Sequence, residues 1–148
     1  MTRFEPVGAA FEALPARSDF LARYRQGRAQ VVWTRLIADL ETPVSAALKL
    51  GDGRPMSCLL ESVEGGAVRG RYSIIGIAPD VVWRASGAIA EVNRQALTDA
   101  DAFRPEPLPT LQSLRAFLAN SRIDLPAELP PIAAGVIGYM GYDTVRLV

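Results

Sequence analysis

The sequence predicts an α+β fold, with a mostly antiparallel sheet and helices packed on one face. Short β-branched runs occur in hairpin-like pairs around polar, glycine-containing turns, at 56–77 and at 80–92. Apolar residues recur at helical spacing within 110–121. The chain has 148 residues, of which 49% are hydrophobic, so it can bury the core of one domain. We expect Trp33 and Trp83 to belong to that core.

The first third of the chain predicts a helix, a strand and a second helix. A short helix is expected over 19–26, with Ser18 as its N-cap. The run 30–38 is rich in β-branched and aromatic residues, which favours a strand. Thr42 and Pro43 then supply an N-cap and the first helical residue of the second helix.

The hairpin at 56–77 joins the strand MSCLLES to the strand RYSIIGI through the turn VEGGAVRG. Strand alternation places Leu60 and Ser62 on one face of the first strand and Glu61 on the other. A second hairpin is predicted around Gly87.

The C-terminal half predicts a loop, a helix and a last strand. Residues 98–109 contain three prolines and several acids, a composition typical of an exposed loop. The best helical pattern follows at 109–121, and a proline-rich connection follows at 125–131. The glycine-rich segment 131–143 is predicted to be a strand. The sequence stops soon after this apolar segment, which is the pattern expected of a cut through a longer protein.

The composition argues against several functional classes. Lys and Arg together number 16, as do Asp and Glu, so no net charge favours nucleic acid or an anionic membrane. Histidine, the commonest general base and zinc ligand, is absent. Cys58, the single cysteine, lies in an apolar run that favours a buried structural thiol. No apolar run approaches the roughly 20 residues of a membrane span, and no secretory signal is recognisable, so we expect a cytoplasmic protein.

The sequence contains no recognisable catalytic motif. GVIGYMGYD has closely spaced glycines but is neither a dinucleotide fingerprint nor a P-loop. Acidic pairs occur at Glu61 with Glu64 and at Asp99 with Asp101, without any sign that they converge in a cleft. Metal binding by Glu61, Glu64 and Asp143 has no support in the pattern. The residues alone therefore indicate a module without its own catalytic apparatus.

Four segments resemble the N-terminal region of anthranilate synthase component I. They are QVVWTRLIADLETP, TPVSAALKL, LLESVEGGAVRGRYSIIG and GVIGYMGYDTVRLV, and they follow the family's order. The resemblance implies that 30–148 form the N-terminal domain of a larger layered α/β/β/α enzyme fold, preceded by 1–29 as an extension with a short helix. The C-terminal chorismate-binding region would be missing from this fragment. The fragment alone is therefore expected to be inactive and to hold no cofactor.

The resemblance also implies an activity for the full-length enzyme, a lyase of tryptophan biosynthesis. That enzyme would convert chorismate and ammonia to anthranilate and pyruvate, with magnesium bound in the C-terminal region. Ammonia would come from glutamine through an amidotransferase subunit or a fused domain. L-Tryptophan would inhibit by feedback, binding between the N-terminal and C-terminal regions. No nucleic-acid or membrane partner is expected.

The resemblance places Pro43, Glu61 and Ser62 in the tryptophan site. A tryptophan pocket needs an acceptor for the ammonium, a donor for the carboxylate and an apolar slot for the indole. Glu61 would accept from the ammonium, and Ser62 would contact the ammonium or the carboxylate. Arg71 would meet the carboxylate as a fork, while Pro43 and Leu60 would wall the indole. The alternative is an exposed pair between Glu61 and Arg71, worth about 0.2–1 kcal/mol.

Two other interpretations stay open. Aminodeoxychorismate synthase component I, of the p-aminobenzoate and folate pathway, shares the fold and the substrate, so the chain could be its corresponding region. A free-standing, non-catalytic binding domain is the second alternative. Under the favoured interpretation half of the tryptophan pocket is missing, so we expect residues 1–148 alone to bind tryptophan weakly or not at all.

Overall fold

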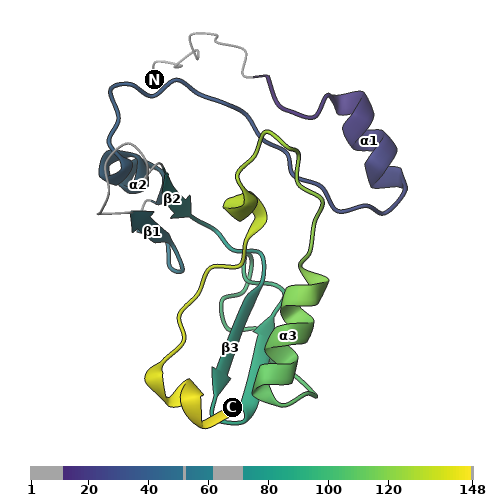
Figure 1. Cartoon of the computed structure of the whole chain (residues 1–148), viewed down its shortest axis with the longest axis vertical. Coiled ribbons are helices and arrows are strands. Elements are labelled where there is room, and N and C mark those ends of the chain that lie inside the picture. Colours follow the sequence, from purple (N-terminus) through teal and green to yellow (C-terminus); the bar gives the residue numbers. More distant parts are fainter. Residues whose placement is uncertain (1–11, 52, 62–71, 148) are drawn as a thin grey trace, which may run out of the picture. The chain divides into compact units, whose positions relative to one another are not determined.

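The computed structural model describes residues 12–51, 53–61 and 72–147 (Figure 1). Its helices are α1 (Arg17–Arg25), α2 (Pro43–Gly51) and α3 (Thr110–Asn120), with the 3-10 helices η2 (Pro131–Ala134) and η3 (Tyr142–Leu147). Its strands are β1 (Cys58–Glu61), β2 (Ser73–Gly76), β3 (Val82–Ser86), β4 (Ile89–Asn93) and β5 (Phe103–Pro105). All the strand pairs among these elements are antiparallel, which confirms the predicted α+β class. The strands form two small sheets, in the orders β1–β2 and β3–β4–β5.

The described residues divide into two compact units. The first unit comprises residues 12–39 and 123–135, and the second comprises 40–51, 53–61, 72–122 and 136–147. Both sheets, together with α2 and α3, belong to the second unit. None of the helices in the described part of the chain combines the length and apolar character needed to cross a bilayer.

The first unit contains α1, which begins earlier than the sequence predicts. Its N-cap is Ala16, without a side-chain hydrogen bond, so the prediction that Ser18 caps the helix is wrong. Ser18 lies within the first turn instead. The C-terminal end follows the prediction, because Gly27 adopts a φ of 68° and donates its N–H to the carbonyl of Tyr24.

The strand predicted over 30–38 does not form. In that segment only Trp33 pairs, through an isolated antiparallel bridge to Leu14, with N···O distances of 2.7 and 2.8 Å. Ile37 is 91% exposed. β-branched and aromatic residues favour a strand only where a neighbouring strand and a half-buried surface receive them. A single backbone bridge does not supply that surface, so the strand that the composition of this segment predicts is not formed.

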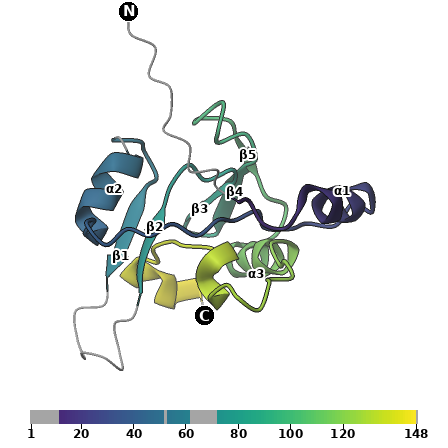
Figure 2. The ribbon, with the colours of Figure 1, turned by 90° about the horizontal axis from the view of Figure 1, so that it is seen from above.

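The first layer of the second unit consists of α2 and the β1–β2 hairpin, and α2 lies against both strands (Figure 2). The hairpin register runs from Cys58↔Gly76 to Glu61↔Ser73, as the sequence pattern predicts for a hairpin here. Cys58 is half-buried rather than fully buried. A Cβ at Gly76 would lie 2.8 Å from the Cys58 sulfur, so glycine is needed for the close approach of this thiol to β2.

The second layer consists of β3–β4–β5 and α3, which packs against β3 and β4 (Figure 1). Gly87 has a φ of 56° in the turn between β3 and β4, which confirms the predicted hairpin. The short strand β5 was missed, because its sequence looks like a proline-rich loop. Pro105 is tolerated there because β5 lies at the edge of the sheet.

The best-packed part of the molecule lies between α3 and the β3–β4 hairpin. Ala90 and Val92 on β4 are 1% and 2% exposed. The Trp83 indole N–H donates to the Ser113 hydroxyl at 3.0 Å, and Ser113 is fully buried. The Thr110 hydroxyl donates to the carbonyl of Gly87 at 2.7 Å. These contacts place Trp83 at the core contact between helix and sheet, as predicted.

The strand predicted over 131–143 is also wrong. This stretch contains η2, an irregular segment over 135–141 and the start of η3. Tyr139 is 92% exposed. Within the described residues the irregular segment pairs with no strand, and a glycine-rich run without a partner has little tendency to extend into regular β structure.

Candidate functional site

Three of the five residues proposed for the ligand site lie within the described structure. Pro43 is the first residue of α2, and Leu60 and Glu61 are the last two residues of β1. Because α2 lies against β1 and β2, the structure brings the helix and the strand together in one unit. Ser62 and Arg71 lie outside the described residues.

The end of β1 is open to solvent. Leu60 is 44% exposed and pairs with Ile74 across the hairpin. Glu61 is exposed and pairs with Ser73. In the described part of the chain its carboxylate makes no ion pair. Because Leu60 and Glu61 are consecutive in β1, the strand end offers an apolar contact on one face and an anionic acceptor on the other.

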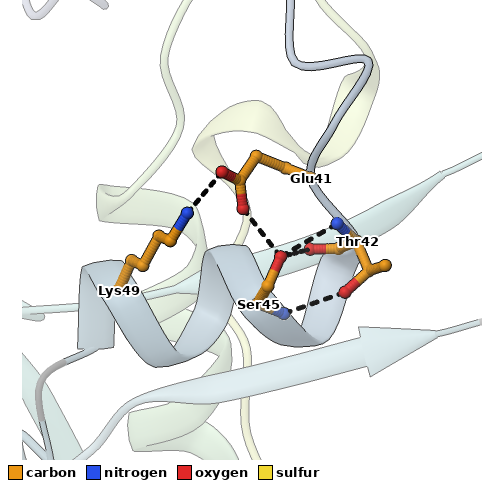
Figure 3. Close-up of polar contacts among 4 residues, drawn as sticks. All are labelled: Glu41, Thr42, Ser45 and Lys49. Carbon is orange, nitrogen blue, oxygen red and sulfur yellow. Dashed lines mark hydrogen bonds and ion pairs between the residues drawn. The ribbon is translucent and has the colours of Figure 1, made fainter.

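The start of α2 is closed by a reciprocal cap between Thr42 and Ser45 (Figure 3). The backbone N–H of Ser45 donates to the Thr42 hydroxyl at 3.1 Å, and the backbone N–H of Thr42 donates to the Ser45 hydroxyl at 2.9 Å. This is the geometry of a capping box, with serine in the position that glutamate or glutamine usually occupies. The predicted roles of Thr42 as N-cap and Pro43 as first helical residue are therefore confirmed.

Glu41 and Lys49 extend this cap along the helix (Figure 3). The Ser45 hydroxyl donates to Glu41 Oε2 at 2.7 Å, and the Lys49 ammonium pairs with Glu41 Oε1. Hydrogen bonds from Lys49, the larger cause, and from Ser45 hold the pKa of the Glu41 carboxyl below its ordinary value. The ionised carboxylate thus ties the residue before the N-cap to the last turn of α2.

Sequence reasoning missed Glu41, Ser45 and Lys49. The available signals were the Thr-Pro-Val-Ser spacing, which fits a capping box with an atypical last member, and the fact that Lys49 is the single lysine of the chain. Neither signal predicts that the glutamate before the cap would reach the lysine eight positions later.

In the acidic pair at Asp99 and Asp101, the Asp99 carboxylate has a structural role. The Asp99 carboxylate accepts the backbone N–H of Asp101 at 2.9 Å. The amide of Asn93, which is fully buried, donates to the Asp99 carbonyl at 2.7 Å, and its oxygen accepts the backbone N–H of Gln95 at 2.8 Å. These bonds shape the loop between β4 and β5, as local side-chain to backbone bonds commonly do.

A second polar cluster crosses the larger sheet. Arg84 and Glu91 are opposite each other on β3 and β4, and their side chains pair at 2.9 Å. The Arg84 guanidinium also lies 3.6 Å from the centre of the Phe103 ring. The arrangement links all three strands through one ion pair and one cation–π contact.

Among the residues that the structure describes, no three acidic or cysteine side chains gather in a way that could hold a metal ion.

Comparison with known proteins yields several curated relatives, although no protein-family model and no solved structure matches the chain. The chain is 51% identical over 125 residues to anthranilate synthase component 1 of Cereibacter sphaeroides, covering 84% of this chain and 25% of the relative. It is 39% identical over 133 residues to the protein of that name from Synechocystis, covering 89% and 25%. It is 37% identical over 140 residues to that of Mycolicibacterium smegmatis, covering 94% and 26%. The chain thus spans about a quarter of the length of these relatives, and it belongs to the anthranilate synthase component 1 family.

Proposed function

We propose that this chain is the N-terminal region of an anthranilate synthase component 1. The complete enzyme converts chorismate and ammonia to anthranilate, pyruvate and water, a step of tryptophan biosynthesis. The observation that carries this proposal is the 51% identity to a named anthranilate synthase component 1 over 84% of the chain.

The complete enzyme works with a glutamine amidotransferase, as a subunit or a fused domain, which supplies the ammonia. No step of the chemistry is assigned to the residues that the structure describes, among which no three acidic or cysteine side chains gather as a metal site would need. Chorismate and magnesium are bound by the part of the enzyme that lies beyond this region.

The role of this region in the proposal is to bind the inhibitor L-tryptophan. Glu61 offers an exposed carboxylate to the ammonium, and Ser62 and Arg71 offer donors to the carboxylate. Pro43 and Leu60 contact the indole. The packing of α2 against β1, together with the exposure of Pro43, Leu60 and Glu61, supports this assignment.

Inhibition then follows from linkage between two sites. Tryptophan shifts the enzyme only if it binds one arrangement of the two regions more tightly than the other. A site shared between regions meets this requirement, because a change in their arrangement alters the contacts that tryptophan makes.

The test is an assay of the complete enzyme with chorismate and either ammonium or glutamine plus the amidotransferase. We expect anthranilate, detected by its fluorescence, together with stoichiometric pyruvate, and a rate that falls as tryptophan is added. Formation of a p-aminobenzoate precursor instead of anthranilate would contradict the proposed activity. Normal anthranilate formation without any effect of tryptophan would contradict the regulatory role alone.

A further inference from the structure

The segment 41–49 contains four polar side chains, and all four belong to one network (Figure 3). We call this network the α2 clasp; it consists of Glu41, Thr42, Ser45 and Lys49. The side chains of Lys49 and Glu41 are 66% and 33% exposed, so water could solvate them separately. Their convergence on one another instead fixes the path of the chain into α2.

Residues of the clasp lie on both sides of Pro43 in the sequence. Proline has a fixed φ that suits the first helical position, but it has no N–H and so donates no hydrogen bond there. Its position is set by its neighbours: Thr42 caps the turn, and the Thr42 carbonyl accepts the backbone N–H of Ala46 at 2.9 Å. Glu41 then ties the incoming chain to Ser45 and Lys49. The residues on both sides of Pro43 are thus tied by hydrogen bonds, while Pro43 itself stays exposed.

The clasp also separates the polar and apolar groups of this segment. The Glu41 carboxylate accepts on both oxygens, from Ser45 and from Lys49, and the Lys49 ammonium already balances its charge. Pro43 remains exposed, and Val44 is 51% exposed. The segment therefore presents apolar surface to a ligand, and on β1, against which α2 lies, the Glu61 carboxylate makes no ion pair with the described residues.

From this geometry we propose that Glu41, Ser45 and Lys49 are positioning residues of the tryptophan site, which hold Pro43 in the orientation that contacts the indole. This inference rests on the proposed function of the region. Binding is tighter when the contacting groups are ordered before the ligand arrives, because less conformational freedom is lost on binding. Residues of the clasp would thus affect tryptophan affinity without touching tryptophan.

The experiment measures the tryptophan concentration that gives half-inhibition of the complete enzyme. Ser45→Ala is expected to raise it roughly fivefold, the factor that corresponds to loss of one helix cap. Lys49→Met is expected to raise it by roughly twofold, because an exposed ion pair contributes less. Ser45→Thr and Lys49→Arg keep a hydroxyl and a charge, and should restore inhibition to nearly the level of the unsubstituted enzyme. Ser121→Ala is the matched control, because it removes a hydroxyl that bonds the Phe117 carbonyl at the end of α3, away from the clasp.

The double variant Ser45→Ala/Lys49→Met adds a second measurement. Both side chains act through the Glu41 carboxylate, so the loss of inhibition in the double variant should be smaller than the product of the two single losses. Independent, multiplicative losses would overturn a shared clasp. Equal weakening by Lys49→Met and Lys49→Arg would also overturn it, because the charge contact would then not be the cause.

Two further controls separate the remaining outcomes. Hydrogen exchange of the Ala46 amide, which bonds the Thr42 carbonyl, reports whether the first turn of α2 survives each substitution. If a variant fails to fold, Glu41→Gln, which keeps the size of the side chain and removes its charge, takes its place. Unchanged inhibition in Ser45→Ala or its replacement, with unsubstituted enzyme still inhibited, overturns the positioning role. An unsubstituted enzyme that ignores tryptophan overturns the proposed regulatory function itself.

Discussion

The two helix-on-strand layers of the second unit are held together differently. Helix α3 is fixed to its sheet by buried groups: Ser113 receives the Trp83 indole N–H, and β4 contributes Val92, which is 2% exposed. Helix α2 buries only Gly51, and its polar contacts lie at the surface. The comparison teaches that the α3 layer supplies stability, whereas the α2 layer supplies accessible groups held in defined positions.

The largest effect is expected from Trp83→Ala, which removes the centre of the α3 layer. The cavity and the unpaired Ser113 hydroxyl should lower the free energy of unfolding by about 3 kcal/mol, measured by urea denaturation followed by circular dichroism. Trp83→Phe is the matched control: it keeps an aromatic ring, loses only the N–H donor, and should cost less. A loss below about 1 kcal/mol for Trp83→Ala would contradict the assignment of the core to this layer.

An intermediate effect is expected from Gly76→Ala in the β1–β2 hairpin. The added methyl group would lie 2.8 Å from the Cys58 sulfur and 3.5 Å from Ile137 Cδ1. Either the Cys58 thiol must rotate or the strands must move apart, at a cost of about 2 kcal/mol. Adding Cys58→Ala removes the closest contact and should recover part of the loss. No recovery in the double variant would show that the thiol is not the obstacle.

A smaller effect is expected from Thr42→Ala, which removes the hydroxyl that caps α2. Loss of an N-cap typically costs about 1 kcal/mol, so the unfolding free energy should fall by roughly that amount. Thr42→Ser keeps the hydroxyl, so its unfolding free energy should fall by much less. If both variants lose the same stability, the capping bond is not what holds the helix start.

The smallest effect is a pH dependence of the α2 clasp. The native pKa of Glu41 is lowered by its bonds from Lys49 and Ser45, so ionised Glu41 stabilises the folded state above its ordinary pKa of 4.5. That contribution is lost as the pH falls from 4.5 through the lowered native pKa. An NMR titration of the Glu41 carboxyl carbon checks this directly, and Lys49→Met should move the midpoint back up. A midpoint at or above the ordinary value in the unsubstituted chain would contradict the clasp.

The sequence predicts well those elements whose turn, cap or pairing residues lie within a few positions along the chain. The hairpin around Gly87 and the helix beginning at Pro43 depend on turn and cap residues within a few positions. The two strands that failed, at 30–38 and 131–143, have strand-like composition but no partner strand nearby in the sequence. Whether such a run pairs depends on the tertiary fold, which local propensity does not determine.

The candidate site shows the same division. Family resemblance placed Pro43 and Glu61, and the needs of a tryptophan pocket added Leu60. The structure brings their elements together in one unit. The contact between Glu41 and Lys49 closes only when the intervening residues are wound into a helix with a capped first turn. A sequence pattern does not reveal that the exposed side chains of Glu41 and Lys49 form an ion pair with each other and are not separately solvated.

The central claim is that this region senses tryptophan and does not carry out the chemistry. The most direct measurement is tryptophan inhibition of the complete enzyme carrying Ser62→Ala, compared with the unsubstituted enzyme. We expect the half-inhibitory concentration to rise by about tenfold, the factor for loss of one hydrogen bond to a charged group, while turnover without tryptophan changes far less. Equal losses of turnover and of inhibition, or unchanged inhibition, would contradict the claim.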